Sequence, residues 1–402
     1  MANQTTTDDP ALRIVDPPRS AFRRRRFLVP FWAAALVALA GTITLIISGT
    51  TTLPFNRTVV LEGKLASKAE FFADPQVQRI LMRHGLQVHL TKAGSRDIAN
   101  NDVSGYDFVF PSGQPAAVLI RNQRQRDKQY FKVFKPFFSP LILATFRSYA
   151  EKLATVGKAA TGQQGPEVAK EYYFNLNVTK FVGLMEDRRT WADLGLPNGN
   201  RVLAQSSDVC WSNSAGVYLG LIAFVANGNQ VPVTETEALR LADRIKPWLT
   251  SQGLANEEVA RLYFAPEGRG LAPVAVIYEH QFLAHQMRVK EQTGALDEQR
   301  VLLYPEAQLQ TVPELIALTP EGARLGELIA TLPELRARAL ALGLRVLEPD
   351  GTLSNGQLSE QLSRSGLPVP LTGVGDTETF LPSVPLLEKM ITRVGECPEV
   401  PR

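Results

Sequence analysis

The chain of 402 residues has 43 lysines and arginines against 40 aspartates and glutamates, which gives a net charge of +3. Six of the arginines and three of the aspartates lie in residues 1–48, so residues 49–402 carry 37 basic and 37 acidic side chains and no net charge. Such a balance gives no support to a nucleic-acid-binding surface in this part of the chain. Its 354 residues exceed what one hydrophobic core usually organises, so we expect two lobes.

The N-terminal segment predicts a membrane anchor. Residues 27–48 contain no charged side chain and would extend about 33 Å as a helix, enough to cross the hydrocarbon core of a bilayer. The four arginines at positions 23–26 favour the cytoplasmic side. We therefore expect a disordered cytoplasmic tail (1–26), a single transmembrane helix (27–48), a linker (49–57) and an extracytoplasmic domain at the cell membrane.

Two other interpretations of this segment remain open. A cleaved signal peptide would have a shorter apolar region and a small-residue exit, to which the Ser-Gly-Thr at 48–50 is a poor match. Arg24 and Arg25 also fit a loose twin-arginine export pattern, although Arg23 precedes them where Ser or Thr is usual. We favour the uncleaved anchor, and all three interpretations export the domain that follows.

Cysteine is rare in the chain, with Cys210 and Cys397 alone. The pair could form one disulfide across the fold, or the two could be unpaired thiols. Because a chain of this length can be held by packing without covalent links, we favour the unpaired thiols.

The first third of the large domain predicts the strand and helix alternation of a parallel sheet. Asp74 and Pro75 are suited to begin a helix that runs to His84, and Gly85 is suited to end it. A turn is expected at 66–68. The strands expected around these elements are 59–62, 87–90 and 106–110.

The remaining two thirds continue the same alternation, without repeats or low-complexity segments. Ser212 is expected to cap a strongly apolar helix over 215–226, and Gly253 is expected to end an amphipathic helix over 234–252. The strands expected here are 141–146, 201–205, 274–278 and 301–304. The further helices are 148–156, 178–191, one after 279, 321–330, 333–342 and 385–394.

Small hydroxyl or amide side chains follow several of these strands. In open α/β sheets, ligands bind beyond the carboxyl ends of the strands, where helix N–H groups point outward. Any one such serine is more often only a helix cap. Several of them in two regions of the chain favour a shared cleft. The residues in question are Ser67, Ser95, Ser112, Ser212, Asn213 and Ser214.

The order and spacing of several segments resemble bacterial extracellular solute-binding proteins of the type II periplasmic-binding fold. No single segment is a strict signature, and the match extends over most of residues 58–395. The segments are FFADPQVQRILMRHGLQVHLTKAGSRD (71–97), YDFVFPSGQPAA (106–117), FFSPLILATFRSYAEKL (137–153), SSDVCWSNSAGVYLGLIAFVANG (206–228) and PVAVIYEHQF (273–282). VLLYPEAQL, LTPEGARLGELI and ALGLRV resemble the family's return segment.

The resemblance implies a fold of two α/β lobes with ligand closed between them. Lobe one would comprise 58–139 and 280–402, and lobe two 140–279, with crossovers at 140–146 and 274–279. Together with the strand-end serines, it gives a set of candidate ligand-binding residues. These are Ser67, Gly94, Ser95, Pro111, Ser112, Asp208, Ser212, Asn213, Ser214, Tyr278 and Glu279.

The chain also departs from the family pattern. Relatives often have Gly-Ser where this chain has Ala66 before Ser67, and Trp211 is bulkier than the usual residue. Such changes fit an altered ligand or a lobe that no longer binds one. Glu279 could accept hydrogen bonds from a ligand, repel an anion, or be a salt-bridged residue at a helix start.

Motifs of catalysis and cofactor binding are absent from the sequence. It has no G-x-S-x-G, no HExxH, no Walker A and no GxGxxG motif, and neither pair of its four histidines has the spacing of a zinc helix. We therefore expect no enzyme activity and no cofactor. The expected function is capture of a small polar solute, such as an oxyanion, by hinge closure, for a transporter permease or a signalling partner. A ligand-free interaction module on the same fold is the alternative.

Overall fold

The computed structural model describes residues 25–47, 58–163, 172–255, 259–308, 312–348, 355–370, 377–378 and 380–397. The chain divides into two compact units, Met1–Arg57 and Thr58–Arg402. The predicted cytoplasmic tail, apart from its last two residues, and the predicted linker over 49–57 lie outside the described residues.

The first unit contains helix α1 (Arg25–Ile47), close to the helix expected over 27–48. Its described side chains, those of residues 29–44, are mostly apolar and mostly exposed. Over the part of the chain that the structure describes, no helix is both long enough and apolar enough to cross a membrane. The transmembrane helix therefore stays a prediction.

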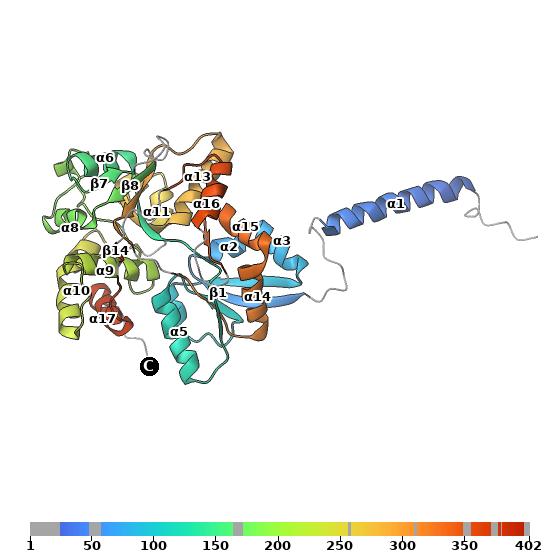
Figure 1. The fold of residues 1–402 in the computed structure, drawn as a ribbon, viewed down its shortest axis with the longest axis horizontal. Helices are drawn as coiled ribbons and strands as arrows, with labels where there is room; N and C mark the ends of the chain where they lie inside the picture. Colours follow the sequence, from blue (N-terminus) through green and yellow to red (C-terminus); the bar gives the residue numbers. More distant parts are fainter. Residues whose placement is uncertain are drawn as a thin grey trace, which may run out of the picture. The chain divides into compact units, whose positions relative to one another are not determined.

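The second unit begins with a lobe built on a five-stranded sheet, which we call lobe one. Its strand order is β2-β1-β3-β12-β4, with β1, β2 and β3 parallel and β12 antiparallel to both of its neighbours. Figure 1 shows α2, α3, α5 and α14 around this sheet. Its strands are β1 (Val59–Leu65), β2 (Leu86–Lys92), β3 (Phe108–Phe110), β4 (Lys132–Phe134) and β12 (Leu315–Ala317). Its helices are α2 (Ala69–Ala73), α3 (Pro75–Arg83), α4 (Ser95–Asn100), α5 (Gln114–Arg126), α14 (Pro320–Thr331) and α15 (Pro333–Ala341).

The start and end of α3 follow the prediction. Asp74 Oδ1 accepts hydrogen bonds from the backbone N–H groups of Gln76 and Val77, both at 3.0 Å. Gly85 follows in the left-handed conformation, with φ of 71°, which glycine adopts without strain. Because β1, β2 and β3 run in the same direction, their carboxyl ends meet at one edge of the sheet.

A second five-stranded sheet forms the lobe that we call lobe two. Its order is β7-β8-β10-β6-β9, and β6 runs antiparallel to β10 and β9. The strands are β6 (Leu141–Phe146), β7 (Ala160–Gly162), β8 (Tyr173–Leu176), β9 (Val274–Tyr278) and β10 (Arg300–Pro305). The helices are α6 (Arg147–Thr155), α8 (Val178–Glu186), α9 (Asn213–Ala226), α10 (Glu235–Thr250), α11 (Val259–Phe264), α12 (Gly268–Leu271), α13 (Glu279–Thr293), α16 (Asn355–Arg364) and α17 (Val384–Gly395), with a 3₁₀ turn η2 at Ala192–Leu194.

The chain crosses between the lobes before β6 and returns after β10, so the crossover predicted at 274–279 is wrong. That segment is strand β9, which pairs with β6 from Leu141↔Tyr278 to Thr145↔Val274 and is buried along its whole length. It is the edge strand of the lobe-two sheet and belongs to the lobe-two core, and the chain continues from it into α13, which contacts β9 and β6 of the same lobe. Near the crossings are two short sheets, β5 (Phe137–Phe138) with β13 (Arg345–Val346) and β11 (Ala307–Gln308) with β14 (Thr377–Glu378).

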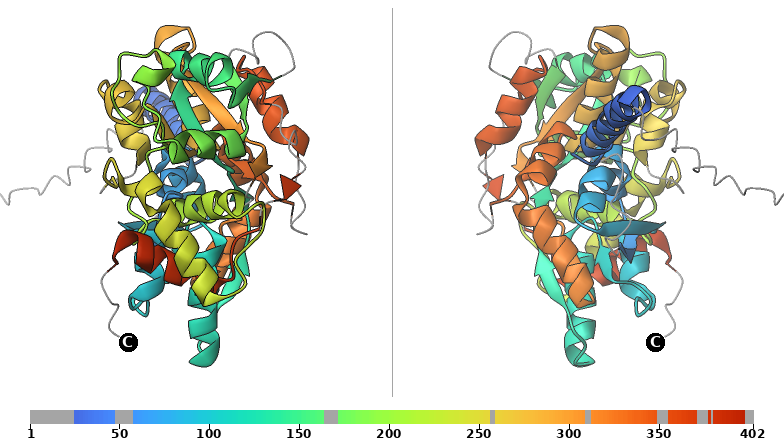
Figure 2. Two further views of the ribbon diagram at one scale, coloured as in Figure 1. Left: turned by 90° about the vertical axis from the view of Figure 1, so that its left-hand side faces the viewer. Right: turned by 90° about the vertical axis from the view of Figure 1, so that its right-hand side faces the viewer.

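The prediction that all of 280–402 belongs to lobe one is also wrong. Strand β10 pairs with β8 and β6 in the lobe-two sheet, and nearly all of its side chains are buried there. Helix α17, dark red in Figures 1 and 2, lies beside α10, and its apolar face joins the lobe-two core. The residues of that face are Leu387, Met390, Ile391 and Val394.

The strand predicted at 201–205 does not form. Arg201 and Gln205 make only isolated bridges, to Thr190 and Ala275 respectively. The side chains of 202–205 are buried nonetheless. The apolar pattern therefore predicted the burial of this segment correctly and its secondary structure wrongly.

Candidate functional site

A cleft with a volume of about 340 Å³ is lined by residues of both lobes. Nine of the eleven predicted site residues line it, including Ser95, Ser112 and Ser214, three of the strand-end residues for which the sequence predicts a shared cleft. The other six are Ser67, Gly94, Asp208, Ser212, Asn213 and Tyr278. Pro111 and Glu279 are not among its lining residues. Whether the nine touch a ligand stays a prediction.

Three serines from successive βα loops form the lobe-one wall. The Ser112 hydroxyl accepts a hydrogen bond from Ser67 N at 3.0 Å and lies 2.6 Å from the Ser67 hydroxyl. The Ser95 hydroxyl accepts from Ser112 N at 2.9 Å. The serines therefore hold the three loops together and form an ordered wall of the cleft.

The lobe-two wall is the N-terminus of α9. Ser212 caps the helix by accepting from Ala215 N at 3.4 Å, and its hydroxyl lies 2.8 Å from that of Ser214. A helix of fourteen residues places the positive end of its dipole and its free N–H groups here. This wall therefore suits a ligand oxygen with negative charge.

Asn213, the first residue of α9, has an unsatisfied donor. Its side chain is 5% exposed and lines the cleft, yet its Nδ2 makes no hydrogen bond within the described residues. A buried amide without a partner costs free energy, so native proteins rarely leave one. Nδ2 has no exposed surface and lies against Gly113 in this conformation, so a ligand oxygen would satisfy it after a small movement of the side chain or of the lobe contact.

The two lobes touch at this cleft. A Cβ at Gly94 of lobe one would overlap the carbonyl oxygen of Trp211, and a Cβ at Gly113 would overlap the Asn213 amide. Glycine is the residue that permits such approach. Arg96 adds hydrogen bonds from its backbone N to Trp211 O at 3.3 Å and from its Nε to Cys210 O at 3.2 Å. The structure therefore describes a conformation in which the lobes are in contact.

Charged side chains of both signs line the cleft, namely Glu70, Lys92 and Asp208. Asp208 Oδ1 accepts a hydrogen bond from Cys210 N at 2.8 Å, which orders the loop before α9. Lys68 lies behind the lining, with Nζ 4.1 Å from the centroid of the Tyr278 ring. A mixed set of this kind suits a polar solute better than a strongly charged one.

His280 lies behind the cleft and is neutral. Burial, and secondly the charge of Lys68, hold the pKa of its imidazole well below the usual 6.5. Its backbone N donates to the Ser139 hydroxyl at 3.0 Å. A neutral histidine that is 3% exposed is placed for a structural role.

Glu279 is a buried structural residue, which corrects its place among the predicted cleft residues. Its carboxylate is fully buried. It accepts hydrogen bonds from Nε and Nη2 of Arg345, both at 2.7 Å, and from the Tyr304 hydroxyl at 2.6 Å. Burial, and secondly the charge of Glu279, raise the pKa of Tyr304 well above 10, so its hydroxyl remains a donor. The carboxylate oxygens are occupied by these partners.

Several lining residues had no sequence signal. Ser207 lines the cleft with Ala255, Val259 and Ala260, because Val259 N donates to the Ser207 hydroxyl at 3.2 Å and so draws α11 to the loop. Gln281 lines it from the first turn of α13. A contact between a loop and a helix so far apart in sequence gives no local pattern.

The two cysteines form a disulfide, so the expectation of unpaired thiols is wrong. The Cys210–Cys397 bond has an S–S distance of 2.13 Å and a Cα–Cα distance of 5.4 Å. Packing of α17 on α10 brings the end of α17 to the loop before α9. The loop that carries Asp208 and Trp211 is thus covalently joined to the last described helix.

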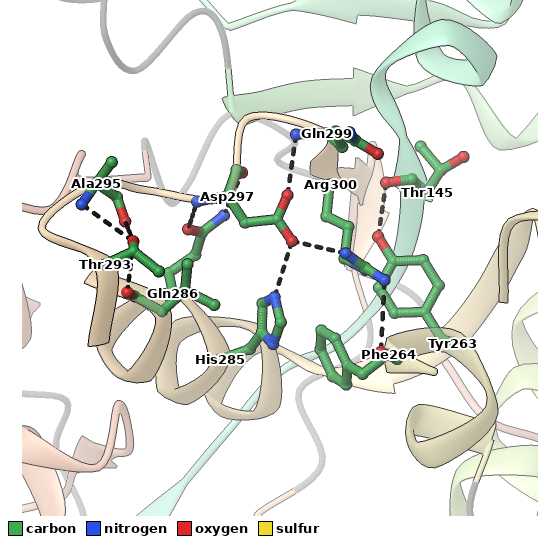
Figure 3. Close-up of polar contacts among 11 residues, drawn as sticks. Thr145, Tyr263, Phe264, His285, Gln286, Thr293, Ala295, Asp297, Gln299 and Arg300 are labelled. Atoms are coloured by element: carbon green, nitrogen blue, oxygen red, sulfur yellow. Dashed lines mark hydrogen bonds and ion pairs between the residues drawn. The ribbon is translucent and has the colours of Figure 1, made fainter. Parts of the chain in front are cut away.

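A cluster of ionisable side chains lies away from the cleft, around Asp297 (Figure 3). Asp297 accepts hydrogen bonds from His285 at 2.9 Å, Arg300 at 2.7 Å and Gln299 N at 3.0 Å, and the Phe264 ring stacks on His285. These contacts link α13, β10 and α11. The cluster is therefore a structural joint, and both Asp297 oxygens are in use.

Within the described ranges, no group of three His, Cys, Asp or Glu side chains is placed to hold a metal ion.

Comparisons with known proteins give structural neighbours alone. No family model and no curated protein matches the chain. Iron-bound HitA from Pseudomonas aeruginosa is similar with a TM-score of 0.51 and 12% identity, over 84% of this chain and 99% of HitA. The substrate-binding protein of an ABC transporter from Agrobacterium tumefaciens gives 0.49 and 12%, over 85% and 95%. The sulfate-binding protein SubI from Mycobacterium tuberculosis gives 0.42 and 14%, over 78% and 92%. At these identities the likeness concerns the fold.

Proposed function

The chain has the fold of type II periplasmic solute-binding proteins, and from this premise we propose that it captures a small polar solute between its lobes by hinge closure. The observation that carries the proposal is the buried Asn213 amide, which lines the cleft and makes no hydrogen bond within the described residues. Ligand contact with both lobes would favour the closed form over the open one.

The proposed ligand has an anionic or carbonyl oxygen for the N-terminus of α9, and an oxyanion is one such ligand. Asn213 Nδ2 and the free N–H groups of the helix supply donors, and Ser67, Ser95 and Ser112 supply hydroxyls opposite. Glu70 and Asp208 in the same lining oppose a high negative charge. These groups favour a solute that both accepts and donates hydrogen bonds.

We propose further that the domain is anchored at the outer face of a cell membrane and serves a transporter permease or a signalling partner. The support lies in the uncharged residues 27–48, after four arginines. The described part of α1 exposes large apolar side chains all around, Val29, Phe31, Trp32, Leu36, Val37 and Leu39 among them. A helix that is apolar on every face is typical of a segment surrounded by lipid or protein.

We propose no enzymatic role. HitA and the Agrobacterium protein are described as iron-bound and substrate-binding proteins respectively, and the hydroxyls of this cleft are bonded to one another. No histidine is among the described residues that line the cleft, so none of them is placed to activate a nucleophile there.

A ligand-free interaction module is the second candidate, and the interlobe contacts favour it. Arg96 joins the lobes directly through hydrogen bonds to the backbone carbonyls of Cys210 and Trp211. A protein with such contacts could use the closed fold as a rigid surface for a partner.

A thermal-shift screen of the full chain in detergent separates the two candidates. The screen uses pools of oxyanions, sugars, amino acids and host extract, followed by native mass spectrometry. A true ligand at 100 times its Kd stabilises the folded state by about 2.7 kcal/mol. Asn213→Ala should remove this shift, whereas the matched control Asn101→Ala, an exposed asparagine, should retain it. If no pool shifts the melting temperature and no mass is retained, the interaction module is the better account.

A further inference from the structure

Lobe two has a second hollow, which shares no lining residue with the cleft. Its volume is about 440 Å³, within the range of small-molecule sites. It lies between the end of α8, the segment 201–203 and α10. Nothing in the proposed function uses it.

The floor of this hollow is apolar. Met185, Val202, Leu203 and Trp248 line it and are each at least nine-tenths buried. A dry floor of this kind strengthens electrostatic attraction at the rim and accepts an apolar ligand group.

The rim is strongly basic. Arg188, Arg201 and Arg244 all line the hollow, and Glu186 is the one carboxylate among its described lining residues. Glu186 accepts a hydrogen bond from Arg244 Nη2 at 2.8 Å, and the two side chains form an exposed ion pair. Three guanidinium groups against one carboxylate leave an excess of positive charge over the floor.

Two of the three arginines are held in place by backbone carbonyls. Arg201 Nη1 donates to Arg188 O at 3.2 Å, and Arg244 Nη1 donates to Ala226 O at 3.0 Å. The Arg244 guanidinium also lies 5.7 Å from the centroid of the Trp248 ring. Guanidinium groups that are ordered in this way lose little freedom when they bind an anion.

Arg188 is the arginine left available. Its side chain makes no hydrogen bond or ion pair within the described part of the chain, and its backbone is left-handed, with φ of 54°. An arginine is strained in that conformation, which favours glycine.

We propose that this hollow binds an organic anion that has a phosphate or carboxylate head and an apolar body. Arg188 and Arg201 would hold the head through paired N–H donors, which match the oxygens of such groups. The apolar body would lie on Trp248 and Met185. No bond is made or broken, so the site is one of recognition.

Calorimetry on the full chain in detergent tests the proposal with phenyl phosphate, benzoate, inorganic phosphate and phenol as probes. Phenyl phosphate or benzoate should bind at least tenfold more tightly than phenol, which lacks the charge. Inorganic phosphate should bind at least tenfold more weakly than phenyl phosphate, since it lacks the apolar body. The affinity should fall as the salt concentration rises.

Matched variants locate the binding. Arg188→Gln and Arg201→Gln should each weaken phenyl phosphate at least tenfold, and Arg201→Lys should weaken it by less. Arg189→Gln is the control, because Arg189 is adjacent and does not line the hollow. Asn213→Ala should leave this binding unchanged, which separates the test from that of the cleft. Absence of binding at millimolar concentration, or equal affinity in Arg188→Gln and wild type, would overturn the proposal.

Discussion

Arg96 of lobe one donates a hydrogen bond from Nε to the carbonyl oxygen of Cys210 in lobe two, at 3.2 Å. The same guanidinium pairs with Glu388 of α17, which also packs on lobe two. Arg96 is 8% exposed, so its charge depends on these partners for solvation. One side chain thereby joins the two lobes beside the cleft.

Replacing Arg96 by Met should shift the domain toward an open form. The variant loses charge-assisted hydrogen bonds across the lobes, each worth about 1.5–3 kcal/mol. Small-angle X-ray scattering without ligand should show a larger radius of gyration than for wild type. Arg393→Met is the control, because its exposed partner Asp243 lies on lobe two as well. An unchanged scattering curve in the Arg96 variant would show that other contacts hold the lobes.

Removal of the disulfide should destabilise lobe two. The bond closes a chain segment with a sequence separation of 187 residues, and such cross-links stabilise by about 2–5 kcal/mol. Denaturant unfolding of Cys210→Ser/Cys397→Ser should show this loss. Reductant should lower the stability of wild type to a similar extent and leave the double variant unchanged. A stability equal to that of wild type would mean that packing of α17 is sufficient.

Glu279→Gln should be strongly destabilising, because it leaves the Arg345 charge buried without its partner. Loss of one member of such a pair costs about 3–5 kcal/mol. Glu334→Gln, which removes the exposed pair with Arg83, should change the unfolding free energy by about 0–1 kcal/mol. Chemical denaturation compares the two variants. Equal effects would contradict the burial assigned to Glu279.

The lobe-one wall and the end of the helix before β2 could be predicted, because their signals are local. Ser67, Ser95 and Ser112 each follow a strand, and the carboxyl ends of parallel strands meet at one edge. Asp74 and Gly85 carry the cap and stop signals of α3 in sequence alone. Each of these residues depends on neighbours a few positions away.

The partners of Glu279 and Cys210 could not be predicted in the same way. Glu279 pairs with Arg345, and Cys210 pairs with Cys397, across long stretches of chain. The prediction that α17 belongs to lobe one was wrong for the same reason, since the apolar face of this helix is equally suited to either core. Local pattern gives the type of an element, whereas its partner is decided by packing.

Acid should weaken the joint around Asp297. Burial raises the pKa of this carboxyl, but hydrogen bonds from His285 and Arg300 and the Arg300 charge lower it by more, so its net pKa lies below the ordinary value. The folded state thus binds fewer protons than the unfolded state, whose Asp titrates near about 3.9. This contribution to stability is complete above about pH 5 and is lost as the pH falls below the unfolded value.

Unfolding experiments between pH 7 and pH 3 test this dependence. Asp297→Asn should be less stable than wild type at pH 7, and the difference should shrink toward pH 3. Asp187→Asn, at an exposed aspartate, is the control and should follow wild type throughout. A constant difference between wild type and Asp297→Asn across this range would show that the carboxylate charge is not the source of the effect.

The first strand of the large domain, β1, belongs to lobe one, whereas the disulfide at Cys397 attaches the last described residue to lobe two. A donor dye attached ahead of Val59 and an acceptor placed just after Cys397 would therefore move with separate bodies. Energy transfer between them would read the hinge motion directly, with no need to know which molecule drives it.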